Sequence, residues 1–440
     1  MFKTSSQGTP NMSSLPSNRS ESVFDDYKPA YTAAQAAVEA NRCLGCYDAP
    51  CIKACPTAID IPSFIRKIAT QNVEGAARTI LTSNILGQSC ARVCPVEVLC
   101  VGDCVYNEMG VPPIQIGRLQ RFATDAQADR TFFEAGAASG KRVGIIGGGP
   151  AGLAAAHRLR RFGHAVTIYD GRTRPGGLNT TGVAPYKLRA EASVEEAERV
   201  LSIGGIDWKG GVLVPRDRSW DDLLARHDAL FLGFGLGGDT RLAGDELSGV
   251  WGATAFIEQM KLATVDLRGV RRAAVIGGGN TAVDVVRELL GLGVPTVTLV
   301  YRGTEATMSG YEHEWGVAKE EGASAAWSSV PLGFAGTGRV TAVRVADAGP
   351  DRKALPGTER ELPCDLAILA IGQGKLGSLV ATIPGVAVDR GVIVTDASGR
   401  TGHERVFAGG DCRNGGKEVV NAVAEGRDAA EAIHRMLGGN

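Results

Sequence analysis

The distribution of hydrophobic positions divides the chain into a helical first part and a strand-rich second part. In the segment PSFIRKIATQNVEGAARTILTS, apolar residues recur at steps of three and four, as on one face of a helix. These residues are Phe64, Ile65, Ile68, Val73, Ala76 and Ile80. The pattern predicts helices from Ser22 to about Phe133, followed by a polar, Ala- and Gly-rich junction, TFFEAGAASGK.

Two later segments follow a different pattern: an apolar strand, a glycine-rich loop, a helix and a second strand. They read RVGIIGGGPAGLAAAHRLRRFGHAVTIYD and RAAVIGGGNTAVDVVRELLGLGVPTVTLVYR. Two such units predict an α/β protein with two doubly wound dinucleotide-binding domains behind an all-helical domain. We expect no long stretch to remain for a further catalytic domain.

The bulk composition is that of a globular protein. The 440 residues are 44% hydrophobic and 22% charged, and the net charge is -1. This balance gives no basic footprint for nucleic acid and no attraction to an anionic membrane. We see no uninterrupted apolar run of about eighteen residues, so no membrane span is expected.

The first 22 residues, MFKTSSQGTPNMSSLPSNRSES, are rich in Ser, Asn and Pro. They contain no apolar stretch that could serve as the core of a secretory signal, and we expect a disordered tail. The expected location is therefore the reducing cytoplasm, where structural disulfides are rare.

The first glycine loop lies between a predicted strand at 143–146 and a predicted helix at 153–161. Its glycines permit a tight turn, close approach to a pyrophosphate and close packing of helix on strand. The next strand ends in Asp170, at the usual distance for an acid that binds an adenosine ribose. The predicted nucleotide contacts in this loop are Gly147, Gly148, Gly149, Pro150, Ala151 and Gly152.

Two further segments favour FAD at this first site. RPGGLNT follows Asp170, and RVFAGGDC near the end of the chain predicts a strand leading into Gly410 and Asp411 and then a helix at 418–434. This arrangement resembles the two-dinucleotide flavoprotein reductases, in which that aspartate contacts the flavin ribityl chain. The resemblance implies a discontinuous FAD domain at 137–265 and 366–440, an inserted NAD(P) domain at 266–365, and a helical domain at 23–136 behind the 1–22 tail.

The second glycine loop has alanine at its third position, a variant that the fingerprint allows. Its predicted contacts are Gly277, Gly278, Gly279, Asn280 and Thr281. The following strand ends in Arg302, which alone would favour a 2′-phosphate and hence NADPH. The next residues supply Glu305, Glu312 and Glu314 and no further Arg or Lys before Lys319, which favours NADH over NADPH.

Eight of the ten cysteines occur in two groups, CLGCYDAPCIKACP and CARVCPVEVLCVGDC. The first repeats the Cys-Pro pattern of two-cluster ferredoxins with one spacing widened. Two iron–sulfur clusters shared between the groups are the favoured interpretation, and zinc, which prefers paired arms in tetrahedral sites, is the alternative. Cys364 and Cys412 stand alone and are expected to be buried free thiols.

The segments CLGCYDAPCIKACPTAIDIPSFI, NILGQSCARVCPVEVLCVGDCV and IQIGRLQRFA resemble dihydropyrimidine dehydrogenase, and most of all the separate NADH-oxidising subunit of the bacterial enzyme. The resemblance implies two [4Fe-4S] clusters. One would be held by Cys43, Cys46, Cys51 and Cys104, and the other by Cys55, Cys94, Cys100 and Gln120. Counting cysteines alone would assign Cys90 in place of Gln120, and Cys90 remains the alternative ligand.

The same resemblance places FAD on 147–151, on the segment from Asp170 through Gly177 and Leu178, and on Gly410 and Asp411. It places Lys187 near FAD, where the family has arginine. The loop at 278–281 and Arg302 would contact the nicotinamide dinucleotide, and the family members that use NADPH carry further arginines that this chain lacks.

The implied activity is oxidation of NADH through FAD and the clusters to a partner subunit that reduces uracil and thymine to their 5,6-dihydro forms. No catalytic side chain is assigned, because hydride transfer to a flavin requires no side-chain acid or base. The glutamate synthase small subunit and NAD(P)H:ferredoxin-type oxidoreductases share the architecture and remain alternatives. A non-catalytic scaffold with zinc-bound helices and degenerate nucleotide folds is the alternative from a different class.

Overall fold

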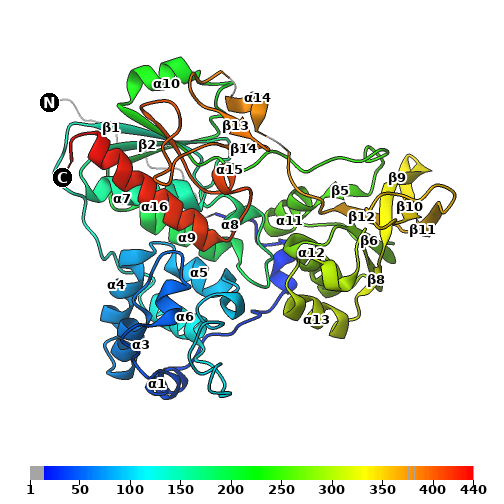
Figure 1. Ribbon diagram of the computed structural model, residues 1–440, viewed down its shortest axis with the longest axis horizontal. Coiled ribbons are helices and arrows are strands. Elements are labelled where there is room, and N and C mark those ends of the chain that lie inside the picture. Colours follow the sequence, from blue (N-terminus) through cyan, green and yellow to red (C-terminus); the bar gives the residue numbers. More distant parts are fainter. Residues whose placement is uncertain (1–13, 375, 381, 440) are drawn as a thin grey trace.

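The computed structural model describes residues 14–374, 376–380 and 382–439. It contains a helical region, drawn in blue and cyan, and two regions built around sheets (Figure 1). Residues 1–13 of the predicted tail lie outside the described residues.

The helical region contains the cysteines. Thr32 and Gln35 form a reciprocal capping box at the start of α1, and Asp60 caps α3 by accepting from the Ser63 N–H at 3.1 Å. Phe64, Ile65 and Ile68 of α3 are buried, as their spacing predicts. The elements are α1 (Ala33–Asn41), α2 (Pro50–Lys53), α3 (Ile61–Ala69), α4 (Val73–Ser83), α5 (Gly87–Val93), the 3-10 helix η2 (Val96–Val98) and α6 (Ile116–Asp125).

The described end of the predicted tail is ordered. Residues Ser20–Val23 form a 3-10 helix, η1, and the side chain of Glu21 is fully buried. The Ser20 N–H donates to the Ala263 carbonyl at 2.9 Å, and Glu21 accepts from the Ala190 N–H at 3.1 Å. The polar composition of this segment therefore reflects hydrogen bonding to other elements rather than disorder at 20–22.

The first sheet is parallel, with strand order β15-β4-β1-β2-β3. Because β15 (Val406–Ala408) comes from the end of the chain, the sheet joins two distant segments. Its other strands are β1 (Arg142–Ile146), β2 (Ala165–Asp170), β3 (Ile206–Gly210) and β4 (Ala229–Leu232). The associated helices are α7 (Pro150–Arg161), α8 (Leu178–Thr181), α9 (Ala190–Leu201), α10 (Trp220–Arg226), α14 (Gly377–Val380), α15 (Asp411–Asn414) and α16 (Val419–Met436).

Helix α16 packs closely along α7 (Figure 1). The contact depends on Gly426, because a Cβ there would lie 2.1 Å from the Ala151 carbonyl oxygen. The end of the chain is in this way held against the helix that follows the first glycine loop. This confirms that the first nucleotide-binding domain is discontinuous.

The second sheet is also parallel, in the order β5-β12-β6-β7-β8. Its strands are β5 (Val250–Gly252), β6 (Arg272–Ile276), β7 (Thr296–Val300), β8 (Ser324–Ala326) and β12 (Leu366–Leu369). With it are α11 (Ala253–Leu262), α12 (Asn280–Gly291), α13 (Glu312–Glu320) and the 3-10 helix η3 (Glu305–Thr307). Since β5 and β12 belong to this sheet, the inserted domain extends beyond the predicted limits of 266 and 365 on both sides.

An antiparallel sheet, β11-β10-β9, projects from the second domain at the far right of Figure 1. Its strands are β9 (Ser329–Thr337), β10 (Arg339–Asp347) and β11 (Arg360–Pro363). A small two-stranded sheet consists of β13 (Val388–Asp389) and β14 (Val392–Ile393). Cys364 and Cys412 are buried free thiols, as predicted. None of the helices in the described part of the chain has the length and apolarity needed to cross a bilayer.

Candidate functional site

The first glycine loop requires glycine at two positions. Gly147 has φ 102°, and a Cβ there would lie 2.3 Å from the Gly233 carbonyl oxygen. A Cβ at Gly152 would lie 1.9 Å from the Gly147 carbonyl oxygen. The loop therefore turns tightly and holds α7 against β1, which leaves the first N–H groups of α7 free for a phosphate.

Asp170 closes this loop from the end of β2. Its carboxylate accepts from the Gly148 N–H at 2.6 Å and from the Arg172 N–H at 2.7 Å. Burial raises the pKa of Asp170, although the two N–H donors oppose the shift. The carboxylate is thereby fixed beside the loop, in the position predicted for an acid that binds an adenosine ribose.

The end of the chain completes the site. Gly410 has φ 75°, its N–H donates to Glu425 at 2.7 Å, and a Cβ on it would lie 2.9 Å from the Ala151 Cβ. The neighbouring carboxyl of Asp411 has its pKa raised to about 6 by burial, with Glu425 and Glu418 adding to the shift. A polar ligand that donates to Asp411 would offset part of this burial cost.

A single cavity of about 710 Å³ connects the two nucleotide-binding domains. This volume is within the range usual for cofactor sites. Of the residues predicted from sequence, the cavity is lined by Gly147, Gly149, Pro150, Ala151, Asp170, Gly177, Leu178, Lys187, Asn280, Thr281, Gly410 and Asp411. The chain thus forms a glycine-lined cradle with the buried carboxylate of Asp170 beside it, an arrangement that fits FAD.

The remaining predicted contacts, Gly148, Gly152, Gly277, Gly278, Gly279 and Arg302, are not among the described residues that line the cavity. Gly148 donates its N–H to Asp170 instead, and Gly152 has a packing role. Arg302 is exposed at the end of β7. These residues shape the loops or lie at their outer ends.

The second loop is built like the first but is held by different partners. A Cβ at Gly277 would lie 2.3 Å from the Ala370 carbonyl oxygen. The Gly278 carbonyl accepts from the Ser309 hydroxyl at 3.1 Å, and Asn280 accepts from the Tyr311 N–H at 2.9 Å. The segment after β7 therefore folds back over this loop, leaving Asn280 and Thr281 on the shared cavity.

Lys187 lies in the cavity but bonds across to the second domain. Its Nζ is 2.9 Å from Asp284 Oδ1 and 2.7 Å from Glu314 Oε1. Tyr311 makes a second contact between the domains, donating to Glu418 Oε1 at 2.7 Å just before α16. Sequence reasoning gave no role to Asp284, Tyr311 or Glu418, and it treated Glu314 only as one of several acidic residues that disfavour a 2′-phosphate. Their positions depend on how the domains pack, which no local motif encodes.

The eight clustered cysteines line two separate cavities. One is lined by Cys43, Cys46, Cys51 and Cys104. The other is lined by Cys55, Cys90, Cys94, Cys100 and Gln120. The thiols surround each cavity instead of meeting at one point: in the described ranges no three His, Cys, Asp or Glu side chains are placed to hold a single metal ion. A [4Fe-4S] cluster takes four cysteine ligands around a cube, which fits this arrangement.

Several thiols in these cavities have pKa values raised above those of free cysteine. Burial raises the pKa of Cys51 to about 12, with Cys43, Cys104 and Cys46 adding to the shift. A hydrogen bond to Cys90 and burial raise the pKa of Cys94 well above its usual value. Iron binds thiolates, so these groups must lose their protons when a cluster is bound.

Gln120 is buried beside the second cysteine cavity. Its Nε2 donates to the Gly87 carbonyl at 2.8 Å, which fixes the orientation of the amide. Cys90 is also buried and lies next to Cys94. Both candidates for the fourth ligand thus line the same cavity, and both alternatives remain.

The 710 Å³ cavity and the second cysteine cavity adjoin each other, because residues that are neighbours in the sequence line one cavity or the other. Val93 and Pro95, on either side of Cys94, line the larger cavity, and Cys94 lines the smaller one. At the start of α16, Val419 lines the larger cavity and Val420 the smaller. The helical domain therefore contacts the first nucleotide site at the cysteine group that contains Cys94.

Comparison with protein families and solved structures agrees with this geometry. Residues 19–132 match dihydropyrimidine dehydrogenase domain II, 4Fe-4S cluster, and residues 141–426 match pyridine nucleotide-disulphide oxidoreductase. FprA from Mycobacterium tuberculosis covers 68% of this chain and 85% of its own with a TM-score of 0.57 at 20% identity. Lactococcus lactis thioredoxin reductase covers 68% of this chain and 99% of its own with a TM-score of 0.54 at 22% identity. These two structures support the predicted fold.

Two curated relatives from Escherichia coli K12 match nearly the whole chain. The NAD-dependent dihydropyrimidine dehydrogenase subunit PreT is 37% identical over 95% of this chain and 98% of its own length. The glutamate synthase [NADPH] small chain is 34% identical over 93% of both. The chain therefore belongs to the PreT family of dihydropyrimidine dehydrogenase subunits, related to the glutamate synthase small chains, and is an NAD(P)H-dependent flavin and iron–sulfur oxidoreductase.

Proposed function

We propose that the chain is the electron-input subunit of a cytoplasmic dihydropyrimidine dehydrogenase. It oxidises NADH through FAD and passes electrons through two [4Fe-4S] clusters to a partner subunit, which reduces uracil and thymine to their 5,6-dihydro forms. The observation that carries this proposal is the contact between the 710 Å³ cavity and the Cys94 region described above.

FAD, when bound, accepts two electrons with a hydride and releases them singly, as iron–sulfur clusters require. The chain's own residues hold and orient the groups. We assign the pyrophosphate to the loop 147–152, the adenosine ribose to Asp170, and the ribityl chain to Gly410 and Asp411. We assign the dinucleotide substrate to the loop 277–281, with Arg302 at its adenosine end.

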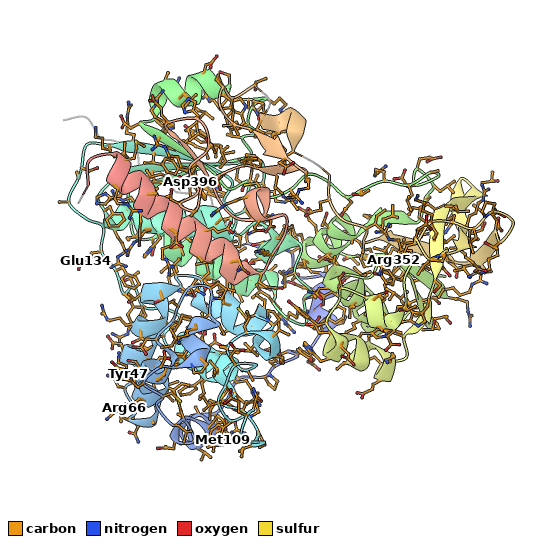
Figure 2. The ribbon with its side chains drawn as sticks, viewed as in Figure 1. Tyr47, Arg66, Met109, Glu134, Arg352 and Asp396 are labelled. Carbon is orange, nitrogen blue, oxygen red and sulfur yellow. The ribbon has the colours of Figure 1, made fainter. Side chains whose placement is uncertain are left out.

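The two cysteine cavities suggest an order for the relay. The cavity lined by Cys94 adjoins the nucleotide cavity, and Ile61 lines both cysteine cavities. The cavity lined by Cys43 is also lined by Cys46, and the next residue, Tyr47, has a fully exposed side chain on the helical domain (Figure 2). We therefore propose that electrons enter at the Cys94 cluster and leave from the Cys43 cluster.

For the fourth ligand of the Cys94 cluster we retain Gln120, as the family resemblance implies. The Cys90→Ser variant should then keep its iron, whereas Gln120→Ala should change the electron paramagnetic resonance signal of one cluster. Iron analysis with these spectra distinguishes the two candidates, and loss of half the iron in Cys90→Ser would assign Cys90 instead.

The division of labour is tested with the purified chain alone. We expect it to oxidise NADH with an artificial acceptor and not to consume NADH on addition of uracil. In an anaerobic titration, a flavin band over a broad iron–sulfur background should be bleached at lower NADH than NADPH. Uracil-dependent NADH loss by the single chain, or a co-purifying partner that uses 2-oxoglutarate and glutamine, would contradict the proposal.

A further inference from the structure

The large cavity contains one buried carboxylate oxygen without a partner. Glu314, in the first turn of α13, is 5% exposed and lines the cavity. Its Oε1 lies 2.7 Å from Lys187 Nζ. Its Oε2 makes no hydrogen bond to any of the residues that the structure describes.

Such an oxygen is costly to leave unpaired. A buried polar atom without a hydrogen bond costs about 1–3 kcal/mol, and more when it is charged. The positions of both groups are fixed, because Lys187 is also held by Asp284 at 2.9 Å, and Asp284 accepts a hydrogen bond from Tyr186. A ligand with an N–H donor at this position would satisfy the oxygen.

The position of Glu314 identifies which part of a ligand reaches it. Asn280 and Thr281 of the second loop line the same cavity, as do Gly410 and Asp411 of the first domain. Glu314 contacts Lys187 of the first domain, and Tyr311, three residues earlier, contacts both Asn280 of the second loop and Glu418 of the first domain. Glu314 therefore lies where the second loop meets the site proposed for FAD. The part of a nicotinamide dinucleotide that extends from the pyrophosphate toward FAD is its nicotinamide end.

We propose that Glu314 binds the nicotinamide ring by accepting a hydrogen bond from its carboxamide NH₂ group, with Lys187 positioning the carboxylate. The inference rests on the dinucleotide site of the proposed function. The positive charge of the oxidised ring adds to the attraction. Glu314 thus selects the reactive end of the substrate, while the loop 277–281 and Arg302 hold the other end.

The proposal is tested by measuring the affinity of three ligands for the flavin- and cluster-loaded chain by calorimetry. The ligands differ in whether they carry the carboxamide N–H donor and the ring. NAD⁺ has the carboxamide, 3-acetylpyridine adenine dinucleotide has the charge and carbonyl but no N–H donor, and ADP-ribose lacks the ring. We expect the wild-type chain to prefer NAD⁺ over the acetyl analogue by about tenfold, the range for a hydrogen bond to a charged group. In Glu314→Gln the preference should fall to about twofold or less, with ADP-ribose affinity unchanged.

Two matched variants control for indirect effects. Glu312 is on the same helix but is exposed and is not among the residues that line the cavity, so Glu312→Gln should keep the tenfold preference. Asp284→Asn removes the other partner of Lys187 but leaves Glu314, and it should also keep the preference for NAD⁺.

The outcomes are distinguishable. A Glu314→Gln variant that keeps the preference, or that loses ADP-ribose binding as well, would overturn the role of Glu314. An equal loss of preference in Asp284→Asn would assign the effect to Lys187 and overturn it too. A wild-type chain that does not bind ADP-ribose would contradict the proposed dinucleotide site itself.

Discussion

The two glycine loops share one sequence pattern but are closed in different ways. In the first loop, the Gly148 N–H donates to the buried carboxylate of Asp170 at the end of β2. In the second loop, the ring of Tyr301 packs over Gly278, where an added Cβ would lie 2.5 Å from it. The next residue, Arg302, is exposed. In both loops the glycines determine the turn. The residue at or just after the end of the second strand, Asp170 or Arg302, determines whether a ligand meets a negative or a positive side chain.

The two loops also differ in what covers them. Gly410, from the far end of the chain, packs on α7 beside the first loop. Ser309 and Tyr311, which follow the second loop by about thirty residues, fold back onto it. The first site is therefore enclosed by a distant segment, as suits a tightly held cofactor, and the second by a local segment, as suits a substrate that exchanges.

The largest effect is expected on FAD binding, from a substitution at the third glycine position of the loops. The first loop has Gly152 at this position and the second loop has Ala282. A Cβ at Gly152 would lie 1.9 Å from the Gly147 carbonyl, whereas the second loop already has Ala282 there. Overpacking of this kind costs about 1–3 kcal/mol, so Gly152→Ala should weaken FAD binding by about 5- to 150-fold. Flavin content and fluorescence of the purified variant measure the loss.

The control for this prediction is Ala282→Gly, which removes a Cβ that the second loop accommodates. It should leave flavin content unchanged and alter NAD⁺ affinity by less than about threefold. Equal flavin content in the two variants, with unchanged far-ultraviolet circular dichroism, would show that the loops do not differ in this way.

Much of the fold could be predicted from the sequence because its signals are local. The three- and four-residue period predicts α3 and α4, and the strand–loop–helix–strand order predicts β1, α7 and β2. The position of Asp170 beside the first loop could be predicted because its distance from the loop is set by the length of one helix and one strand. The division of the cysteines between two cavities also agrees with the spacing and the family resemblance.

The rest depends on contacts between distant segments. The strands β5 and β12 lie outside the predicted limits of 266 and 365, and they belong to the second sheet because β12 pairs with β5 and β6. No local pattern encodes which sheet a strand joins. Glu314 was read as one of several acidic residues, and its burial beside Lys187 follows only from domain packing. The burial of Glu21 likewise could not be predicted, because its carboxylate is satisfied by the distant Ala190 N–H as well as by Arg19.

The first site should also have a pH signature, which comes from a carboxyl contributed by the distant end of the chain. The pKa of Asp411 is raised from 3.8 to about 6 by burial. Between these values the folded chain binds more protons than the unfolded chain, so its free energy of unfolding falls as pH rises through this window. The loss amounts to about 3 kcal/mol and is nearly complete by about pH 7, one unit above the folded-state pKa. Asp411→Asn should remove it.

Denaturant unfolding of the FAD-depleted chain at pH 4 to 7 measures this difference. The variant should match the wild type near pH 4 and exceed it at pH 7 by about 3 kcal/mol. Asp389→Asn, at an exposed position, is the control and should follow the wild type throughout. Parallel curves for Asp411→Asn and the wild type would mean that Asp411 is not buried in the absence of FAD.

The smallest effect is expected at the exposed end of the second loop. Arg302 has no hydrogen bond or ion pair with the described residues, while Lys319, the next cation in the sequence, is held by Glu305 at 2.6 Å. A 2′-phosphate would thus meet one free cation. Arg302→Ala should raise the KM for NADPH by about tenfold and the KM for NADH by about twofold. Glu305→Gln should release Lys319 from its ion pair and lower the KM for NADPH alone. Equal changes for both dinucleotides in steady-state assays would place Arg302 away from the ribose, because only NADPH carries the 2′-phosphate.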